Sequence, residues 1–171
     1  MQNYTGCGWE GEKYQRDLDI KDIAKLVKKQ LKEEFPQCKF SVTIERYSGG
    51  QSLNVSLMAA PFQAILAEGN IDVVTNRFVS VEDQGLESRQ YSQLNQYAFK
   101  DDYENEFLQR PAGFNNGAIL SKEAWDTMKR AWKIASSYNY DDSDAMIDYF
   151  NTNFYLHLNI GKWDKPFTQI N

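Results

Sequence analysis

The sequence contains very little cysteine and histidine, the residues that most often cross-link small domains or bind transition metals. Its 171 residues include two cysteines, Cys7 and Cys38, and a single histidine, His157. The cysteines are far apart, form no C-x-x-C pair and suit a reducing compartment, although their number does not exclude a disulfide. One histidine excludes metal sites that need two, such as H-E-x-x-H. The sequence predicts no cofactor.

A catalytic constellation is also missing. A hydrolytic triad would have to use His157 as its base, and no nucleophile-elbow motif surrounds any serine. His157 alternates with Leu156 and Leu158, which predicts a surface-facing side chain on a strand. The sequence therefore favours a protein that binds rather than one that catalyses.

Long hydrophobic runs are absent as well. The longest apolar stretch, residues 57–62, is far too short to span a bilayer. Residues 1–12 are polar and lack the basic and apolar regions of a secretory signal. We expect a cytoplasmic protein with no membrane partner.

The chain has no surplus of basic residues. Its net charge is −5 and its pI is near 5.0, which disfavours non-specific binding to nucleic acid. The charge is unevenly spread, however, because lysines gather in residues 21–32 while acids gather in residues 101–106 and 141–148. A locally basic face is therefore compatible with the acidic total, although a solvated helix face is the commoner explanation of such a cluster.

Aromatic residues, in contrast, are plentiful. They make up 14% of the chain, which argues against disorder and supplies large side chains for a core. The length suits one domain, and neither an internal repeat nor a linker-like segment divides it. We expect residues 1–171 to form a single domain.

The clearest predicted element is a helix that begins after Asp19. Apolar residues recur at steps of three and four from Ile20 to Phe35, and Asp19 with Asp22 resembles a capping box. Pro36 ends the helix because the residue before a proline is driven out of the α region. The lysines of this segment fall mostly on its other faces.

A β-hairpin is predicted directly after this helix. Residues 40–45 and 53–57 alternate between apolar and polar side chains, and the turn between them contains Gly49 and Gly50. A helix followed by a hairpin can bury one apolar face against the other. This pattern predicts an α+β fold of two layers, an antiparallel sheet with helices packed on it.

The remaining elements are predicted from shorter signals. Residues 61–68 are expected to form a short helix ended by Gly69, and residues 72–81 have strand character. Ser121 is expected to cap a second amphipathic helix, followed by a short helix over residues 143–150 and a strand over residues 154–160. Residues 82–116 show no pattern that assigns them.

Three parts of the sequence resemble the large polyvalent protein associated domain 29 family. They are the lysine-rich helix ending in Phe-Pro over residues 23–36, the runs KFSV (39–42) and YSGGQSLNV (47–55), and the tail with Ser143-Asp144, DYF (148–150) and Phe154-Tyr155. Such domains occur mainly in proteins of phages and conjugative elements. The resemblance implies a mobile-element or bacterial accessory protein and brings no established activity or catalytic residues with it.

Two sets of residues are candidate sites. The first is a binding surface made by the lysines of the first helix, the adjoining arginine and the hairpin turn: Lys25, Lys28, Lys29, Lys32, Arg46, Tyr47, Ser48, Gly49 and Gly50. The turn resembles an anion-binding nest, although a purely structural glycine hairpin explains it better, and it lacks the lysine and hydroxyl of a P-loop.

The second set is a group of carboxylates, Asp141, Asp142, Asp144 and Asp148, which is a weak candidate for a hard cation such as Ca²⁺ or Mg²⁺. The order of an EF-hand is absent. Helix capping and acids in a first helical turn are the stronger explanation of these residues.

The sequence leaves three functions open. The leading hypothesis is a non-enzymatic binding module for nucleic acid or a host protein, acting through the lysine-rich surface. The second is an acidic counter-defence protein that targets a DNA-handling host enzyme. The third is a metal-dependent enzyme that uses the group of carboxylates in residues 141–148.

Overall fold

The helix and the hairpin at the start of the chain are both confirmed by the computed structural model, which describes residues 3–100 and 117–171. Helix α1 spans Ile20–Glu34, and the Asp19 carboxylate caps it by accepting a hydrogen bond of 2.8 Å from the Lys21 N–H. The Asp22 carboxylate lies 2.9 Å from Lys25 Nζ, so its side chain forms an ion pair on the helix surface. Strands β2 (Lys39–Tyr47) and β3 (Gly50–Ala60) then pair antiparallel.

A five-stranded sheet is built around β3. Strand β9 (Tyr155–Ile160) lies beside it in parallel register, with Ser52 opposite Tyr155 and Leu57 opposite Ile160. Strand β6 (Ser92–Leu94) pairs antiparallel with β9, and the short β10 (Thr168–Gln169) lies parallel to the end of β3. The predicted closing strand is thus confirmed. It is joined to the centre of the sheet in parallel, a direction that alternation alone does not specify.

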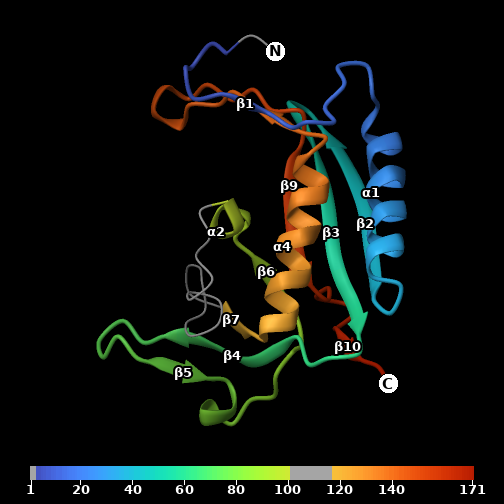
Figure 1. Cartoon of the computed structure of the whole chain (residues 1–171). Coiled ribbons are helices and arrows are strands. Elements are labelled where there is room, and N and C mark those ends of the chain that lie inside the picture. Colours follow the sequence, from blue (N-terminus) through green and yellow to red (C-terminus); the bar gives the residue numbers. More distant parts are fainter. Residues whose placement is uncertain (1–2, 101–116) are drawn as a thin grey trace.

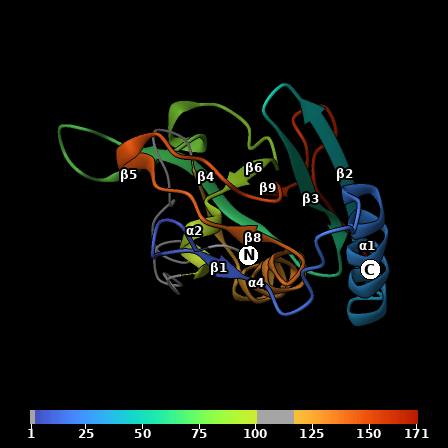
Figure 2. The ribbon, with the colours of Figure 1, turned by 90° about the horizontal axis from the view of Figure 1, so that it is seen from above.

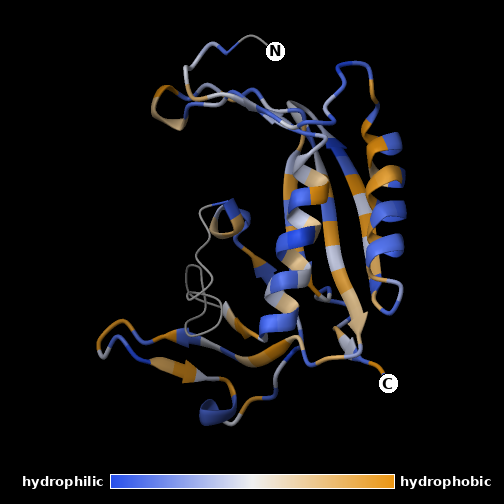
Figure 3. Ribbon diagram, in the orientation of Figure 1, coloured by the Kyte–Doolittle hydropathy of each residue, from blue (hydrophilic) through white to orange (hydrophobic). Residues whose placement is uncertain are grey.

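The two long helices lie side by side on one face of this sheet (Figures 1 and 2). The second, α4, spans Lys122–Ser136 and is capped by the Ser121 hydroxyl as predicted. Leucines and other aliphatic residues of β3 and β9 are buried in the same core as both helices, and each helix alternates hydrophobic and hydrophilic residues along its length (Figure 3). The α+β fold with helices packed on a sheet is therefore confirmed.

The opposite face of the central sheet is polar. It carries Asn54 opposite His157 and Ser56 opposite Asn159 on the two central strands. His157 is half-buried there between the buried Leu156 and Leu158, which places its side chain on the face away from the core. This matches the expected alternation of β9.

A second sheet replaces the helix expected over residues 61–68. Strand β4 (Ile65–Ile71) lies between β5 (Phe78–Ser80) and β7 (Gly117–Leu120) and pairs antiparallel with both. The helix prediction was wrong because pairing on both sides of β4 outweighs the local preference of this segment. Gly69 lies inside the strand and does not end a helix; a Cβ there would lie 2.1 Å from the Val79 carbonyl oxygen.

The strand expected over residues 72–81 is much shorter than predicted. Val73 and Val74 lie in the turn between β4 and β5, where both side chains are exposed. The Asp72 carboxylate fixes this turn by accepting hydrogen bonds from the backbone N–H groups of Val74 and Thr75. A side chain that bonds its own backbone in this way favours a turn over a strand.

The segment without a predicted structure contains small elements. In addition to β6, they are a 3₁₀ turn at Glu82–Gln84 and the short helix α2 (Gln96–Lys100). Residues 101–116 of this segment lie outside the described residues. Phe99 of α2 stacks on Trp125 of α4 with ring centroids 4.7 Å apart, which joins α2 to the core.

The helix expected over residues 143–150 is reduced to one 3₁₀ turn, Ala145–Ile147. Asp148 follows it with φ of +52°, a left-handed conformation that stops the helix. Before this turn, the two-residue strands β1 (Trp9–Glu10) and β8 (Tyr140–Asp141) pair antiparallel. Among the described residues, no helix is both long and apolar enough to cross a membrane.

Candidate functional site

Four lysines of α1 form a stripe along the helix. The buried side of α1 consists of Ile20, Ile23, Val27 and Leu31. At about 100° per residue, Lys25, Lys28, Lys29 and Lys32 fall within an arc of about 100° that lies away from these residues. All four lysines are exposed. We call them the lysine stripe.

The stripe points away from the neighbouring helix. The Glu34 carboxylate accepts a hydrogen bond of 2.7 Å from Arg130 Nε of α4, and Gln30 accepts one of 3.1 Å from the Tyr138 hydroxyl. Gln30 and Glu34 therefore mark the side of α1 that faces α4 and Tyr138, which lies just after the end of α4. Since the lysines lie on the other side, α4 does not cover them.

Acidic neighbours reduce the charge of the stripe only in part. Lys25 pairs with Asp22 at 2.9 Å, and Lys29 lies 3.9 Å from a carboxylate oxygen of Glu33. These side chains are more than half exposed, and exposed pairs contribute little free energy, typically about 0.2–1 kcal/mol. Replacing the Asp22 and Glu33 carboxylates with another anion at these lysines would therefore cost little free energy.

The arginine of the predicted surface is already engaged. Arg46 Nη2 lies 2.6 Å from Asp19 Oδ2, which joins the end of β2 to the N-terminal end of α1. The Lys21 N–H first, and then Arg46, lower the pKa of Asp19 below its ordinary value. The structure thus places the hairpin turn beside the start of α1, while the lysine stripe lies further along the helix.

The turn itself is built as a hairpin. Gly49 has φ of +92°, which a residue with a side chain rarely adopts, and Ser48 is exposed next to it. A Cβ on Gly50 would lie 3.1 Å from the Tyr47 ring and 3.2 Å from the Tyr155 ring. Burial, followed by the neighbouring Tyr155, raises the pKa of the Tyr47 hydroxyl. Gly49 is thus required by its backbone conformation, and Gly50 leaves room for two tyrosine rings.

The predicted carboxylate group does not converge on one point. Asp142 is fully buried and accepts hydrogen bonds from the Tyr4 N–H (2.7 Å), the Thr5 N–H (3.1 Å) and the Thr5 hydroxyl (2.7 Å). Burial alone would raise the pKa of Asp142, but these hydrogen bonds outweigh it and lower the pKa. Asp142 therefore fixes the N-terminal segment to the rest of the fold.

The other three aspartates have local roles. Asp141 accepts from the Ser143 N–H and Asp144 from the Met146 N–H, each at 2.9 Å, while the exposed Asp148 ends the 3₁₀ turn. In the part of the chain that the structure describes, no three or more His, Cys, Asp or Glu residues are grouped so that they could hold a metal ion. The geometry supports turn and cap roles for these residues.

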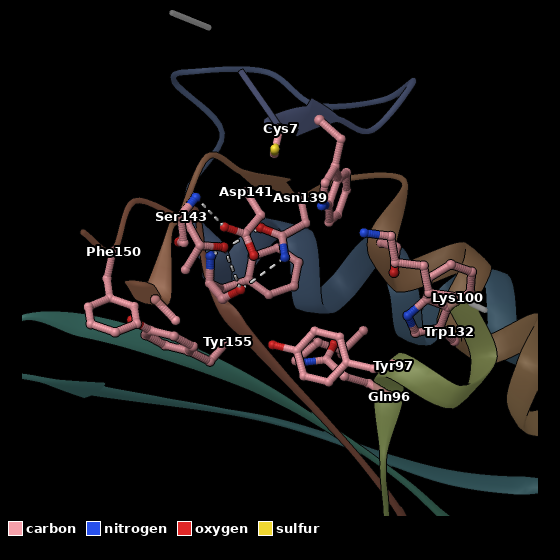
Figure 4. A pocket seen from close by; sticks show the side chains of 16 residues that line it. Cys7, Gln96, Tyr97, Lys100, Trp132, Asn139, Asp141, Ser143, Phe150 and Tyr155 are labelled. Atoms are coloured by element: carbon pink, nitrogen blue, oxygen red, sulfur yellow. Dashed lines mark hydrogen bonds between the residues drawn. The ribbon is translucent and has the colours of Figure 1, made fainter. Parts of the chain in front are cut away.

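A pocket of about 350 Å³ lies between β1, α2, α4 and the loop that precedes β9 (Figure 4). Sequence reasoning did not predict it. Its lining residues come from separate segments of the chain, so no local motif marks them. Six aromatic residues contribute to its wall: Trp9, Tyr97, Trp132, Phe150, Phe154 and Tyr155.

The polar groups of the pocket differ in how many hydrogen bonds they already make within the protein. Asn139 is committed to structure, because its amide donates to the Phe154 carbonyl and accepts from the Tyr140 and Phe154 N–H groups. Asp141 accepts one hydrogen bond, from Ser143, at a single carboxylate oxygen. Lys100 enters the lining from α2, on the opposite side from Asp141 (Figure 4). The pocket thus combines flat rings with one carboxylate and one amine.

The described residues form an α+β fold with an exposed basic stripe on helix α1 and an aromatic pocket beside helix α4. The chain belongs to the large polyvalent protein associated domain 29 family, whose sequence model matches residues 18–111. The match covers α1, the hairpin, β4, β5, β6 and α2, whereas the resemblance seen in residues 143–155 lies outside it. No curated protein and no solved structure matches the chain.

Proposed function

We propose that the protein is a non-enzymatic binding module of a mobile genetic element or its bacterial host, and that it binds nucleic acid through the lysine stripe. The observation that carries this proposal is the arrangement of four exposed lysines on one side of α1, turned away from α4. Membership in a family associated with polyvalent proteins supports the mobile-element context.

The phosphate backbone is the partner that suits this surface. Lysine binds phosphate as a point charge and needs no fixed geometry, which fits long, exposed side chains on a helix. The net charge of −5 opposes binding at long range. Because exposed charges beyond about 10 Å are largely screened at 0.1 M salt, the local stripe rather than the total charge governs contact.

The test is fluorescence anisotropy with labelled single-stranded DNA, double-stranded DNA and RNA at about 50 and 200 mM salt. We expect binding that weakens as salt rises, since each neutralised phosphate releases counterions. A variant with Lys25, Lys28, Lys29 and Lys32 changed to Glu should lose this binding and its salt dependence.

A matched control separates the stripe from net charge. It carries the same number of Lys→Glu changes at lysines outside α1: Lys122 and Lys133 of α4, and Lys162 and Lys165 of the loop after β9. The control should keep most of the affinity of the wild-type protein. Equal losses in both variants would show a non-specific charge effect, and no binding by the wild-type protein at either salt concentration would exclude nucleic acid as the partner.

A further inference from the structure

The aromatic pocket is separate from the lysine stripe, and its chemistry is more specific. We propose that the pocket binds a single nucleotide, with its base between aromatic rings, a base amino group on Asp141 and its phosphate near Lys100. The proposal does not depend on the lysine stripe, because none of the stripe residues lines the pocket.

The aromatic wall favours a flat ligand. Trp9 comes from β1, Trp132 from α4 and Tyr97 from α2, so three separate elements bring rings to the same pocket. Trp9 and Trp132 are half-buried and Tyr97 is 61% exposed, so part of their ring surface remains open. Stacking of a base on an aromatic side chain favours binding and does not require a particular base, because every base has a flat face.

Asp141 supplies the acceptor that a base amino group needs. Its backbone is held in β8 opposite Trp9, and one carboxylate oxygen accepts from the Ser143 N–H. Within the described residues, the other oxygen has no hydrogen-bond donor. A half-buried carboxylate oxygen beside aromatic rings is a strong acceptor for an exocyclic amino group.

Lys100 argues against ligands of other kinds. Its amine lies across the pocket from Asp141 (Figure 4). A purely cationic ligand would be repelled by Lys100, and a purely apolar ligand would bring no donor to the second carboxylate oxygen of Asp141. A ligand with an amino-bearing ring at one end and a phosphate at the other satisfies both groups. The volume of about 350 Å³ is at the lower end of the range of about 300–1,000 Å³ for small-molecule pockets, which suits one nucleotide.

The protein contains its own reporter for occupancy. Cys7 lines the pocket and is exposed, whereas Cys38 is buried. Burial also raises the pKa of the Cys38 thiol, which makes it less reactive than an exposed thiol. Alkylation of the native protein by a maleimide should therefore occur at Cys7, and a bound ligand should slow it.

The experiment measures Cys7 alkylation and tryptophan fluorescence of the full chain during titration with AMP, GMP, CMP and UMP. AMP, GMP and CMP should protect Cys7 and change the fluorescence, while UMP, whose base has no amino group, should bind more weakly. Trp163→Phe is the control for the fluorescence signal, because Trp163 is 82% exposed and does not line the pocket. This variant should keep the change in fluorescence that a bound nucleotide causes.

Two variants separate the proposed contacts. Asp141→Asn keeps the acceptor for Ser143 and should weaken the binding of AMP by about tenfold or more, through loss of a charge-assisted hydrogen bond. Lys100→Ala should weaken AMP but leave adenosine unchanged, since adenosine carries no phosphate. The variant with four charge reversals in the lysine stripe should bind AMP as the wild-type protein does.

Three results would overturn the proposal. They are the absence of Cys7 protection by every nucleotide at millimolar concentration, equal protection by inorganic phosphate alone, and binding of tetramethylammonium in preference to AMP. Each of them leaves the test of the lysine stripe unaffected, because that test uses long nucleic acids and different variants.

Discussion

The two long helices are equal in length, at 15 residues each, but the protein uses them differently. Helix α1 buries four aliphatic side chains against the edge of the sheet. Helix α4 buries seven residues and contacts α1, α2 and β9. The helix surrounded on several sides holds the core together, whereas the helix at the edge leaves one side exposed to solvent. Mutations in the two helices should therefore have different consequences.

The largest loss of stability should follow from Trp125→Ala in α4. Trp125 is 1% exposed and stacks on Phe99, so its removal leaves a large cavity between α4 and α2. We expect the free energy of unfolding to fall by about 3–5 kcal/mol, measured by urea denaturation. A loss below about 1 kcal/mol would show that α4 is less central than its burial indicates.

A smaller loss is expected for Leu31→Ala on the buried side of α1. Leu31 is fully buried, but it belongs to a helix with fewer neighbours, which can adjust toward the space left behind. We expect a cost toward the lower end of the range of about 2–5 kcal/mol known for such changes. Urea denaturation of both variants under one set of conditions compares the helices directly, and a larger loss for Leu31→Ala would reverse the proposed order.

The N-cap of α4 should contribute less than its core residues. The Ser121 hydroxyl accepts a hydrogen bond of 3.2 Å from the Ala124 N–H. Ser121→Ala should lower stability by about 0.5–2 kcal/mol, and Ser121→Asp, which retains an acceptor, should restore part of it. Thermal unfolding followed by circular dichroism measures both variants, and equal losses in both would show that the cap bond is not the cause.

The N-cap of α1 is a carboxylate, so its contribution to stability should depend on pH, unlike that of the Ser121 cap. The folded state lowers the pKa of Asp19, so the contribution of Asp19 is complete above its unfolded-state pKa of about 3.9 and is lost as the pH falls through the lower folded-state pKa. Asp19→Asn should therefore destabilise the protein at pH 7 and destabilise it less near pH 3, where part of this contribution is already lost. Urea denaturation at both pH values tests this, with Ser121→Ala as the control whose effect should not change with pH.

The smallest effect is expected from the ion pair that links the two helices. Glu34 and Arg130 are partly exposed, at 35% and 47%, and the hydrogen bond from Arg130 is the main cause of the lowered pKa of Glu34. A double-mutant cycle with Glu34→Gln and Arg130→Met should give a coupling free energy of about 0.2–1 kcal/mol that decreases with salt. A coupling near zero at low salt would mean that side-chain packing alone aligns α1 with α4.

The sequence predicts the parts of the fold in which one segment buries one face. Helix α1, the hairpin, α4 and β9 show their buried residues as a period of 3.6 or 2, so their type and most of their limits follow from local pattern. Strand β4 shows no such period, because its structure depends on β5 and on β7, which lies about 50 residues further along. Buried Glu68 illustrates this, since its carboxylate accepts hydrogen bonds from the N–H groups of Arg89 and Tyr91.

The candidate sites show the same difference between features that lie in one segment and features that need several segments. The lysine stripe is a local pattern on one helix, and the sequence contains it in full. The pocket brings together Trp9, Tyr97, Trp132 and Asp141 from four elements, and no single segment reveals it. The group of aspartates was visible in the sequence, but Asp141, Asp142 and Asp144 accept hydrogen bonds from different backbone N–H groups. The fourth, Asp148, is exposed at the end of the 3₁₀ turn. Closeness in sequence therefore marked the aspartates as a candidate metal site, although their carboxylates do not come together at one point in the fold.

The parallel pairing of β3 with β9 also decides whether a fragment of this chain can fold on its own. The family match ends at residue 111, whereas β9 and α4 lie beyond that point and provide much of the core against β3. A fragment cut at residues 18–111 would lack the neighbour of its central strand and expose Leu53, Val55 and Leu57 to water. Such a fragment should aggregate or remain partly unfolded, because long unpaired apolar strands associate with one another. The part of the chain that the family model matches therefore lacks α4 and β9, which complete the core around β3.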